Sequence, residues 1–88
     1  MSQSSKTPSL ATEPVILDLR GTPCPINFVR TKLKLAQMSV GQVLEVWLDP
    51  GEPIEQVPPS LIMEGYTDQK MTEEATFFKL TIRVPDNL

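Results

Sequence analysis

The strongest constraint on the fold is a strict alternation of side chains in residues 76–84. From Phe78 to Val84 every second side chain is apolar, and the positions between them are polar. A period of two is typical of a β-strand that buries one face and exposes the other. Residues 43–48 alternate in the same way, so we expect a sheet with one covered face. The expected core positions of these two strands are Leu44, Val46, Leu48, Phe78, Leu80, Ile82 and Val84.

The first half of the chain predicts a strand, a helix and a second strand. Residues 15–19 form a short apolar run that is long enough for a strand. A helix is expected over about 25–38, because Pro25 suits a first helical position and Gly41 supplies a stop. The strand at 43–48 then lies parallel to the first one, through a right-handed crossover.

The second half predicts a short helix and two more strands. Pro58 and Pro59 forbid one uninterrupted helix, so we expect a helix over only about 59–64, with Gly65 as its stop. Residues 66–71 and the alternating run at the C-terminal end then form a pair of strands. The predicted fold class is α+β, a two-layer βαβαββ sandwich with a mixed four-stranded sheet and two helices on one face.

The predicted first helix has an unusually wide apolar arc. Such an arc predicts contact with both the sheet and a neighbouring helix. One stripe consists of Phe28, Leu35 and Met38, and a second consists of Ile26, Val29, Leu33 and Ala36. The expected solvent side consists of Asn27, Arg30, Lys34 and Gln37.

Composition excludes several classes of protein. With one cysteine and no histidine in 88 residues, the chain forms no internal disulfide and lacks the usual tetrahedral zinc ligands, so we expect no metal and no cofactor. Without histidine it also lacks the usual general base of a protease or esterase. We expect a flexible tail over residues 1–13 and one domain over 14–88, without a signal peptide or membrane span, in the cytoplasm.

Charge is distributed unevenly along the chain. The net charge is −3, which argues against direct nucleic-acid binding over the whole surface. Residues 18–38 hold four cations and one carboxylate, a local charge of +3, so the remainder carries −6. The basic side chains of the helix fit either a solvated face or a docking patch for an acidic partner. The candidate docking residues are Arg20, Arg30 and Lys34.

Cys24 is the candidate reactive group. It immediately precedes Pro25, at the expected start of the helix. The first turn of a helix has unpaired N–H groups and a partial positive charge, which together stabilise a thiolate and make its sulfur a better nucleophile. The alternative is that Cys24 is a small buried hydrophobic residue. The Gly-Thr-Pro turn before it and the nearby cations favour a reactive, partly exposed thiol.

The predicted sheet leaves one face without helices. Trp47 and Phe77 have the strand parity that puts them on this open face. Neighbouring side chains can cover them in part, or they can form a surface for a partner or for weak self-association of an otherwise monomeric protein.

A set of motifs is distributed along nearly the whole domain, about residues 15–84. It consists of an amphipathic helix together with Asp18, Gly21, Cys24-Pro25, Gly41, Asp49-Pro50 and Val57-Pro58. In this combination the sequence resembles the TusA/SirA family of small sulfur-carrier proteins. The resemblance implies the βαβαββ sandwich and a persulfide carried on Cys24. By this likeness Cys24 accepts sulfur from a cysteine desulfurase or rhodanese-like donor and passes it to an acceptor protein of the sulfur relay. Members serve tRNA thiolation, molybdenum cofactor assembly or sulfur metabolism.

The sequence departs from the family signature Cys-Pro-x-Pro at one position, where Asn27 replaces the second proline. If Cys24 is the N-cap, the amides of Ile26 and Asn27 both point toward its sulfur. We therefore expect Asn27 to preserve or enhance thiolate stabilisation while it loosens the loop. Asp18 and Gly21 are expected to shape that loop.

Two functions follow as hypotheses. The first is a sulfur carrier with sulfurtransferase character, in which Cys24 holds the transferred sulfur. The second is a non-catalytic interaction or redox-regulatory module, which the change at Asn27 favours. Replacement of Cys24 by serine separates them, because it inactivates a carrier and leaves a binding module largely active.

Overall fold

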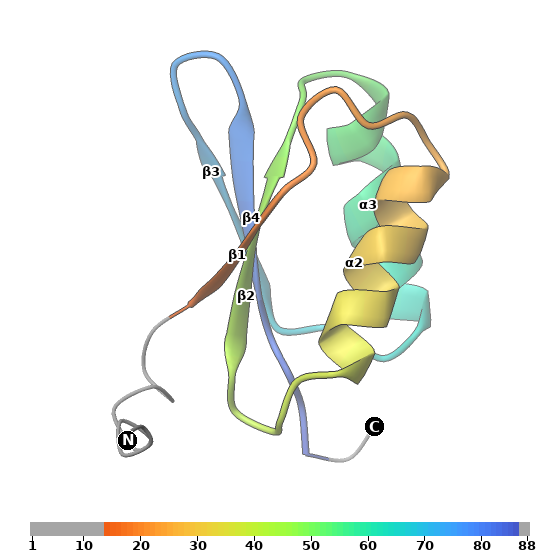
Figure 1. The fold of residues 1–88 in the computed structure, drawn as a ribbon, viewed down its shortest axis with the longest axis vertical. Helices are drawn as coiled ribbons and strands as arrows, with labels where there is room; N and C mark the ends of the chain where they lie inside the picture. The colour runs from red at the N-terminus through yellow and green to blue at the C-terminus, as the bar shows by residue number, and fades with distance from the viewer. Residues whose placement is uncertain (1–13, 87–88) are drawn as a thin grey trace, which may run out of the picture.

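The computed structural model describes residues 14–86, which form a four-stranded sheet with two helices on one face (Figure 1). The predicted fold class is confirmed, whereas the predicted tail over residues 1–13 lies outside the described residues. The elements in chain order are β1 (Val15–Asp18), α2 (Ile26–Ala36), β2 (Val43–Leu48), α3 (Glu52–Met63), β3 (Gln69–Glu73) and β4 (Phe78–Arg83).

The sheet is mixed, with the strand order β1-β2-β4-β3. β1 pairs with β2 in parallel, as the strand–helix–strand order predicts. β4 lies in the centre and pairs antiparallel with both β2 and β3. β1 is an edge strand, so the loop that follows it reaches the helical layer at one corner of the molecule (Figure 1).

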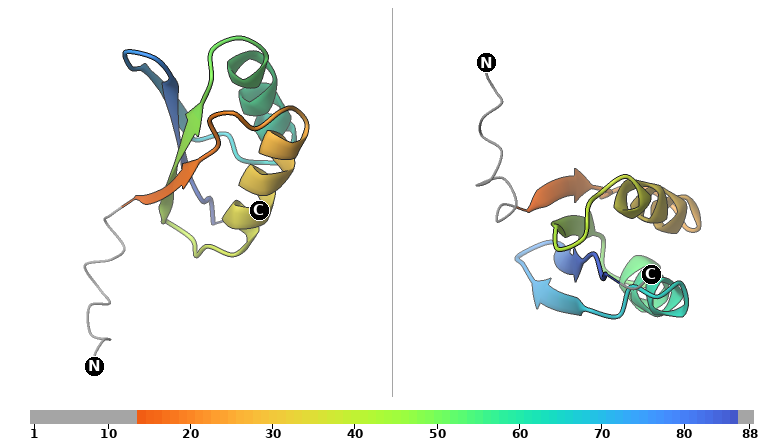
Figure 2. Two further views of the ribbon diagram at one scale, coloured as in Figure 1. Left: turned by 45° about the horizontal axis from the view of Figure 1, so that its top comes forward. Right: turned by 90° about the horizontal axis from the view of Figure 1, so that it is seen from below.

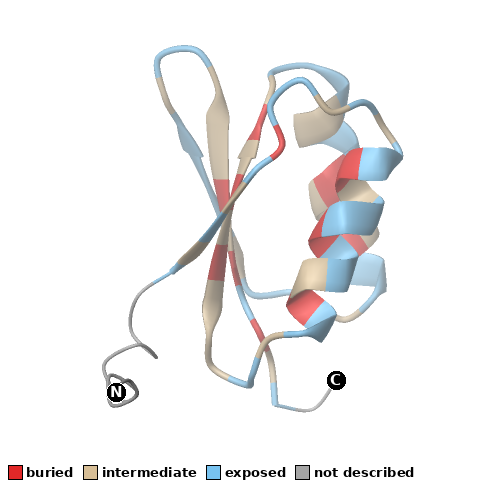
Figure 3. Ribbon diagram, viewed as in Figure 1, coloured by how far each residue is buried: buried red, intermediate tan, exposed pale blue. Residues whose placement is uncertain are grey.

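The core lies between the sheet and the helices (Figure 3). The predicted alternation is confirmed for β2, in which every second side chain is fully buried, and for Leu80 and Ile82 of β4. Phe78, also expected in the core, is only half-buried. From the helices, α2 contributes Leu35, and α3 contributes Val57 and Leu61. Burying an aliphatic side chain of this size contributes roughly 1.5–3 kcal/mol, so this shared layer is the main stabilising element.

The predicted orientation of α2 is wrong in part. Ile26, Val29 and Leu33 are 51%, 46% and 58% exposed, whereas Asn27 and Thr31 are fully buried. The helix turns positions 27, 31 and 35 inward, because a buried polar residue is tolerated when its hydrogen bonds are made locally. The Thr31 hydroxyl donates to the Asn27 carbonyl at 2.8 Å. The second apolar stripe therefore faces outward.

The predicted start of the second helix is also wrong, because α3 runs through Pro58 and Pro59. A proline in a helix removes one N–H and crowds the carbonyl four residues before it. Here those carbonyls belong to Ile54 and Glu55, near the start of α3. The predicted stop at Gly65 is confirmed, since this residue has φ 103° just after the helix ends.

The two helices lie side by side over the covered face, as the views in Figure 2 agree. Lys32 of α2 and Glu64, just after α3, form an ion pair of 3.1 Å across them. Both side chains are substantially exposed, so this pair contributes little stability. The first turns of both helices lie at the same end of the molecule, next to the loop that follows β1 (Figure 1).

Candidate functional site

The loop between β1 and α2 carries Cys24 and is held at several points. The Leu19 N–H donates to the Trp47 carbonyl at 3.0 Å, which extends the pairing of β1 with β2. Gly21 follows with φ 82°, a conformation that favours glycine, and its N–H donates to Asp49 Oδ2 at 2.6 Å. The loop is therefore tied to the end of β2, 28 residues further along the chain.

Cys24 is half-buried and lines an open groove between the first turn of α2 and one face of α3. The groove has a volume of about 390 Å³. Its lining residues are Cys24, Pro25, Phe28, Glu52, Gln56 and Ser60. The thiol is thus accessible and is not sealed inside the core, which is the first requirement for a reactive cysteine.

The wall of this groove that α3 forms, opposite Cys24, was not predicted from the sequence. It consists of Glu52, Gln56 and Ser60, which are four residues apart on one side of α3. That spacing is the signal of a common helix face. We overlooked it because the two prolines argued against a helix through these positions.

The predicted hydrogen bonds to the Cys24 sulfur are wrong in part. The N-cap of α2 is Pro25, not Cys24, and the Cys24-Pro25 peptide bond is cis. The Asn27 N–H donates to the Pro23 carbonyl at 3.1 Å, so it is not directed at the sulfur. Among the hydrogen bonds of residues 14–86, the Ile26 N–H has no acceptor, which leaves one free amide close to Cys24.

Asn27 is a fully buried link between the loop and the helix. Its Oδ1 accepts the N–H of Phe28 at 2.6 Å, and its Nδ2 donates to the Thr22 carbonyl at 3.5 Å. The side chain thus serves the backbone on both sides of Cys24. The expected loosening of the loop stays a prediction.

Arg20 and Asp18 form a tight ion pair on the open face of the sheet. Arg20 donates through Nε and Nη2 to the two carboxylate oxygens at 2.9 and 2.7 Å, and its backbone N–H also donates to Asp18 at 3.1 Å. These hydrogen bonds from Arg20 lower the pKa of Asp18 to about 2. The Asp18 carboxylate in turn raises the pKa of Arg20. Neither side chain lines the Cys24 groove.

The open face also holds the predicted aromatic pair. The rings of Trp47 and Phe77 lie 5.0 Å apart between centroids, and the Arg20 guanidinium lies 4.8 and 4.9 Å from the two rings. Trp47 Nε1 donates to Glu45 at 2.7 Å. Neighbouring side chains therefore cover both rings in part, and a docking role for this face stays a prediction.

The other two candidate docking residues lie together elsewhere. Arg30 and Lys34 line a separate groove of about 300 Å³ between β1 and α2, together with Leu17 and Leu33. Within residues 14–86 neither cation forms an ion pair. The structure thus separates the basic side chains of α2 from Arg20, and their docking role stays a prediction.

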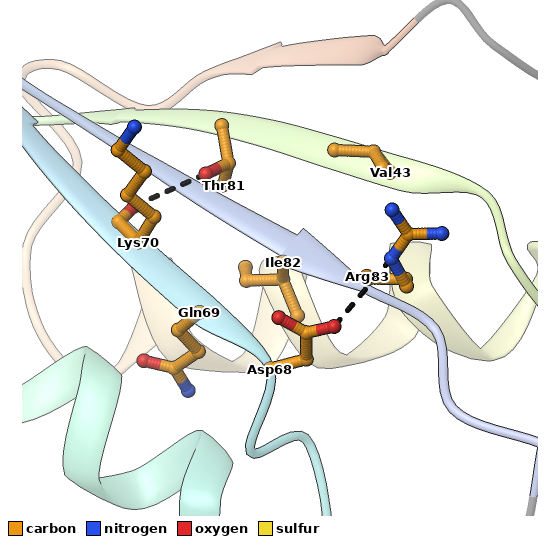
Figure 4. Close-up of a pocket in the computed structure, with 7 residues that line it drawn as sticks. All are labelled: Val43, Asp68, Gln69, Lys70, Thr81, Ile82 and Arg83. Atoms are coloured by element: carbon orange, nitrogen blue, oxygen red, sulfur yellow. Dashed lines mark hydrogen bonds and ion pairs between the residues drawn. The ribbon is translucent and has the colours of Figure 1, made fainter.

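A smaller groove of about 130 Å³ lies on the sheet (Figure 4). Its polar groups are paired with each other: Thr81 Oγ1 donates to the Lys70 carbonyl at 3.2 Å, and Arg83 lies 3.5 Å from Asp68. In the described part of the chain no three potential ligands are grouped to hold a metal ion. Over the same residues, no helix has the length and hydrophobicity to cross a membrane.

Comparison with known proteins gives consistent results. The family described as "Sulfurtransferase TusA" matches residues 15–84. A "Putative sulfur carrier protein" of Archaeoglobus fulgidus is 43% identical over 51 residues, 58% of each chain. One of the same description from Thermotoga maritima is 40% identical over 50 residues, 57% of this chain and 63% of that one. The matches thus span about three fifths of the relatives' lengths.

A solved structure supports the fold independently. The SirA-like protein of Desulfitobacterium hafniense superposes with a TM-score of 0.70 at 22% identity, over 82% of this chain and 99% of that one. At this identity the likeness bears on the fold alone. Since the family match covers most of the chain, the protein belongs to the TusA family of sulfurtransferases.

Proposed function

We propose that this protein carries sulfane sulfur as a persulfide on Cys24. The observation that carries the proposal is the position of this thiol, the one cysteine of the chain, on an accessible groove at the start of α2. Membership of the family supplies the class of chemistry, and Cys24 is the group in the chain able to perform it.

The proposed transfer is an exchange between two sulfur atoms. The Cys24 thiolate attacks the outer sulfur of a donor persulfide, R–S–SH, and a new S–S bond forms as the donor S–S bond breaks. The products are Cys24–S–SH and the donor thiolate R–S⁻, so no external oxidant or reductant is consumed. The acceptor's thiolate then attacks the outer sulfur of Cys24–S–SH in the same way and regenerates the Cys24 thiolate.

The surroundings of Cys24 suit such an exchange. The groove is open, so a donor and an acceptor can reach the same sulfur in turn. Asp49 holds the loop through Gly21, Asp18 holds it through Arg20, and Asn27 holds the segment on both sides of the thiol. We propose that these residues, with Pro25 and Ile26, position Cys24 and that Arg20, Arg30 and Lys34 help partner proteins to dock.

The donor is a cysteine desulfurase or a rhodanese-like protein, and the acceptor is a further protein of a sulfur relay. The acceptor serves tRNA thiolation, molybdenum cofactor assembly or sulfur metabolism. We place this exchange in the cytoplasm, where thiols are kept reduced.

The test is mass spectrometry after incubation with a cysteine desulfurase and cysteine. The wild type is expected to gain +32 Da, about the mass of one sulfur atom, on the peptide that contains Cys24. Cys24→Ser removes the acceptor thiol and abolishes the gain. An unmodified wild type after treatment with several active donors contradicts the proposal.

A second candidate function is a non-catalytic interaction module. The exposed apolar stripe of Ile26, Val29 and Leu33, close to Arg30, favours it, because it leaves a surface that a partner can cover. Complementation in cells separates the two functions. Cys24→Ser is expected to inactivate a carrier, whereas a binding module tolerates this change and is inactivated by Leu33→Asp.

A further inference from the structure

The groove beside Cys24 has a one-sided charge. Of the described residues that line it, Glu52 is the one with a charged side chain, and none is basic. Glu52 is exposed and forms no ion pair within residues 14–86. Its carboxylate is therefore available to act on whatever enters the groove.

The basic residues of α2 and of the loop before it do not line this groove. Arg20 is paired with Asp18 on the open face of the sheet, and Lys32 is paired with Glu64 across the two helices. Arg30 and Lys34 line a different groove. The partial positive charge at the first turn of α3 partly offsets the carboxylate. Replacing Glu52 by a neutral residue therefore removes the negative charge and leaves the helix end uncompensated.

Glu52 lines the same groove as Cys24, so a reagent that reaches the sulfur passes the carboxylate. At an ionic strength of about 0.01 M the Debye length is about 30 Å, so the charge on Glu52 is little screened from such a reagent at low salt.

We infer that Glu52 is a specificity-determining residue that selects the sulfur donor by charge. It disfavours small anionic donors such as thiosulfate and admits an uncharged or basic donor, namely a persulfidated cysteine on a neutral or basic protein segment. In the disfavoured reaction the Cys24 thiolate takes the outer sulfur of S₂O₃²⁻ and releases SO₃²⁻, with a dianion forced close to a carboxylate. This inference rests on the proposed function for its biological meaning, but the charge selection itself is measurable without any persulfide.

The experiment uses two methanethiosulfonate reagents of similar size, one with a sulfonate group and one with a trimethylammonium group. Each reacts with the thiolate to form a disulfide and releases methanesulfinate, and Cys24 is the one thiol in the full chain. The measured quantity is the ratio of the cationic to the anionic rate constant, divided by the same ratio for 2-mercaptoethanol.

For the wild type we expect a normalised ratio above one, which falls toward one at high salt. Glu52→Gln is expected to lower the ratio at least about threefold at low salt, and Glu52→Lys is expected to lower it further. Glu55→Gln is the matched control, because it removes a carboxylate from the same turn of α3 but does not line the groove. Circular dichroism verifies that each variant is folded.

An unchanged ratio in Glu52→Gln and Glu52→Lys overturns the inference, and so does an equal change in Glu55→Gln. A protein that shows the charge selection but gains no sulfur from any donor contradicts the proposed function and leaves the role of Glu52 in place. A protein that gains sulfur but shows no charge selection overturns the inference about Glu52 and leaves the proposed function in place.

Discussion

The open face of the sheet and the groove beside Cys24 differ in whether their polar side chains are paired with one another. On the sheet face Arg20 is bound by Asp18 and lies against Trp47 and Phe77, and Trp47 donates to Glu45. In the groove, the Cys24 thiol and the Glu52 carboxylate line an open space with no cation in its described lining. Groups that are paired with each other stabilise a fold, whereas unpaired groups around a hollow are available to a ligand.

One loop joins these two regions. Its first residues, Arg20 and Gly21, are held by side chains at the end of β1 and beyond the end of β2, and its last residues reach the groove. Asn27 then fixes the loop to α2 from inside the molecule. The comparison therefore predicts that changes on the sheet face alter stability, and that changes at the groove alter chemistry.

The largest effect on stability is expected from Trp47→Ala. Removing a half-buried ring that contacts both Phe77 and Arg20 is expected to lower the free energy of unfolding by about 2 kcal/mol. Urea denaturation measures this change. Ile16→Ala, at an exposed position of the neighbouring strand, is the control and is expected to cost less than about 1 kcal/mol.

The same Trp47→Ala variant also tests whether the two regions are independent. When it is folded, the alkylation rate of Cys24 is expected to stay within about twofold of wild type. A larger change would contradict the independence of the sheet face and the groove.

A somewhat smaller effect is expected from Asn27→Ala. It leaves the Phe28 N–H and the Thr22 carbonyl without their side-chain partner, so a loss of about 1–2 kcal/mol is expected. Because the same hydrogen bonds adjoin Cys24, the alkylation rate of the folded variant is expected to change as well. Stability and rate that both match the wild type would show that Asn27 does not link the loop to the helix.

The smallest effect is expected from the pH dependence of Asp18. Its pKa is lowered to about 2 in the folded protein, against about 4 in an unfolded chain. The stabilisation is therefore complete above about pH 4 and is lost as the pH falls through about 2. Denaturation of wild type and Asp18→Asn across this range is expected to show a difference that narrows with acid. Arg20→Gln removes the hydrogen bonds that lower the pKa of Asp18. In that background the stability difference caused by Asp18→Asn is expected not to change with pH; a difference that still narrows with acid would show that Arg20 is not the cause of the lowered pKa.

The sheet could be predicted from the sequence because burial of one face gives its strands an apolar side chain at every second position. The alternation in β2 and β4 identified their core side chains, and the parallel pairing of β1 with β2 followed from the helix between them. Cys24 was predicted as the N-cap of that helix, whereas Pro25 is the N-cap and Cys24 lies one residue before it.

The remainder depended on contacts that no local pattern reveals. The helical periodicity predicts Asn27 on the solvent side, yet α2 turns Asn27 and Thr31 inward, where they form local hydrogen bonds. Val29 and Leu33 are exposed instead. α3 contains two adjacent prolines, which in the sequence predict an interrupted helix. The far wall of the groove, formed by Glu52, Gln56 and Ser60, was not predicted for that reason. Sequence reasoning thus predicted the accessible position of Cys24 but not the residues that surround it.

The central claim is that Cys24 carries the sulfur. It is tested most directly by transfer of ³⁵S from labelled cysteine through a purified cysteine desulfurase, followed by digestion and mapping of the label. We expect label that is released by a thiol reductant, confined to the peptide with Cys24, and absent from Cys24→Ser, while Trp47→Ala is still labelled when folded. Label that persists in Cys24→Ser, or a folded wild type that takes up none, would contradict the account.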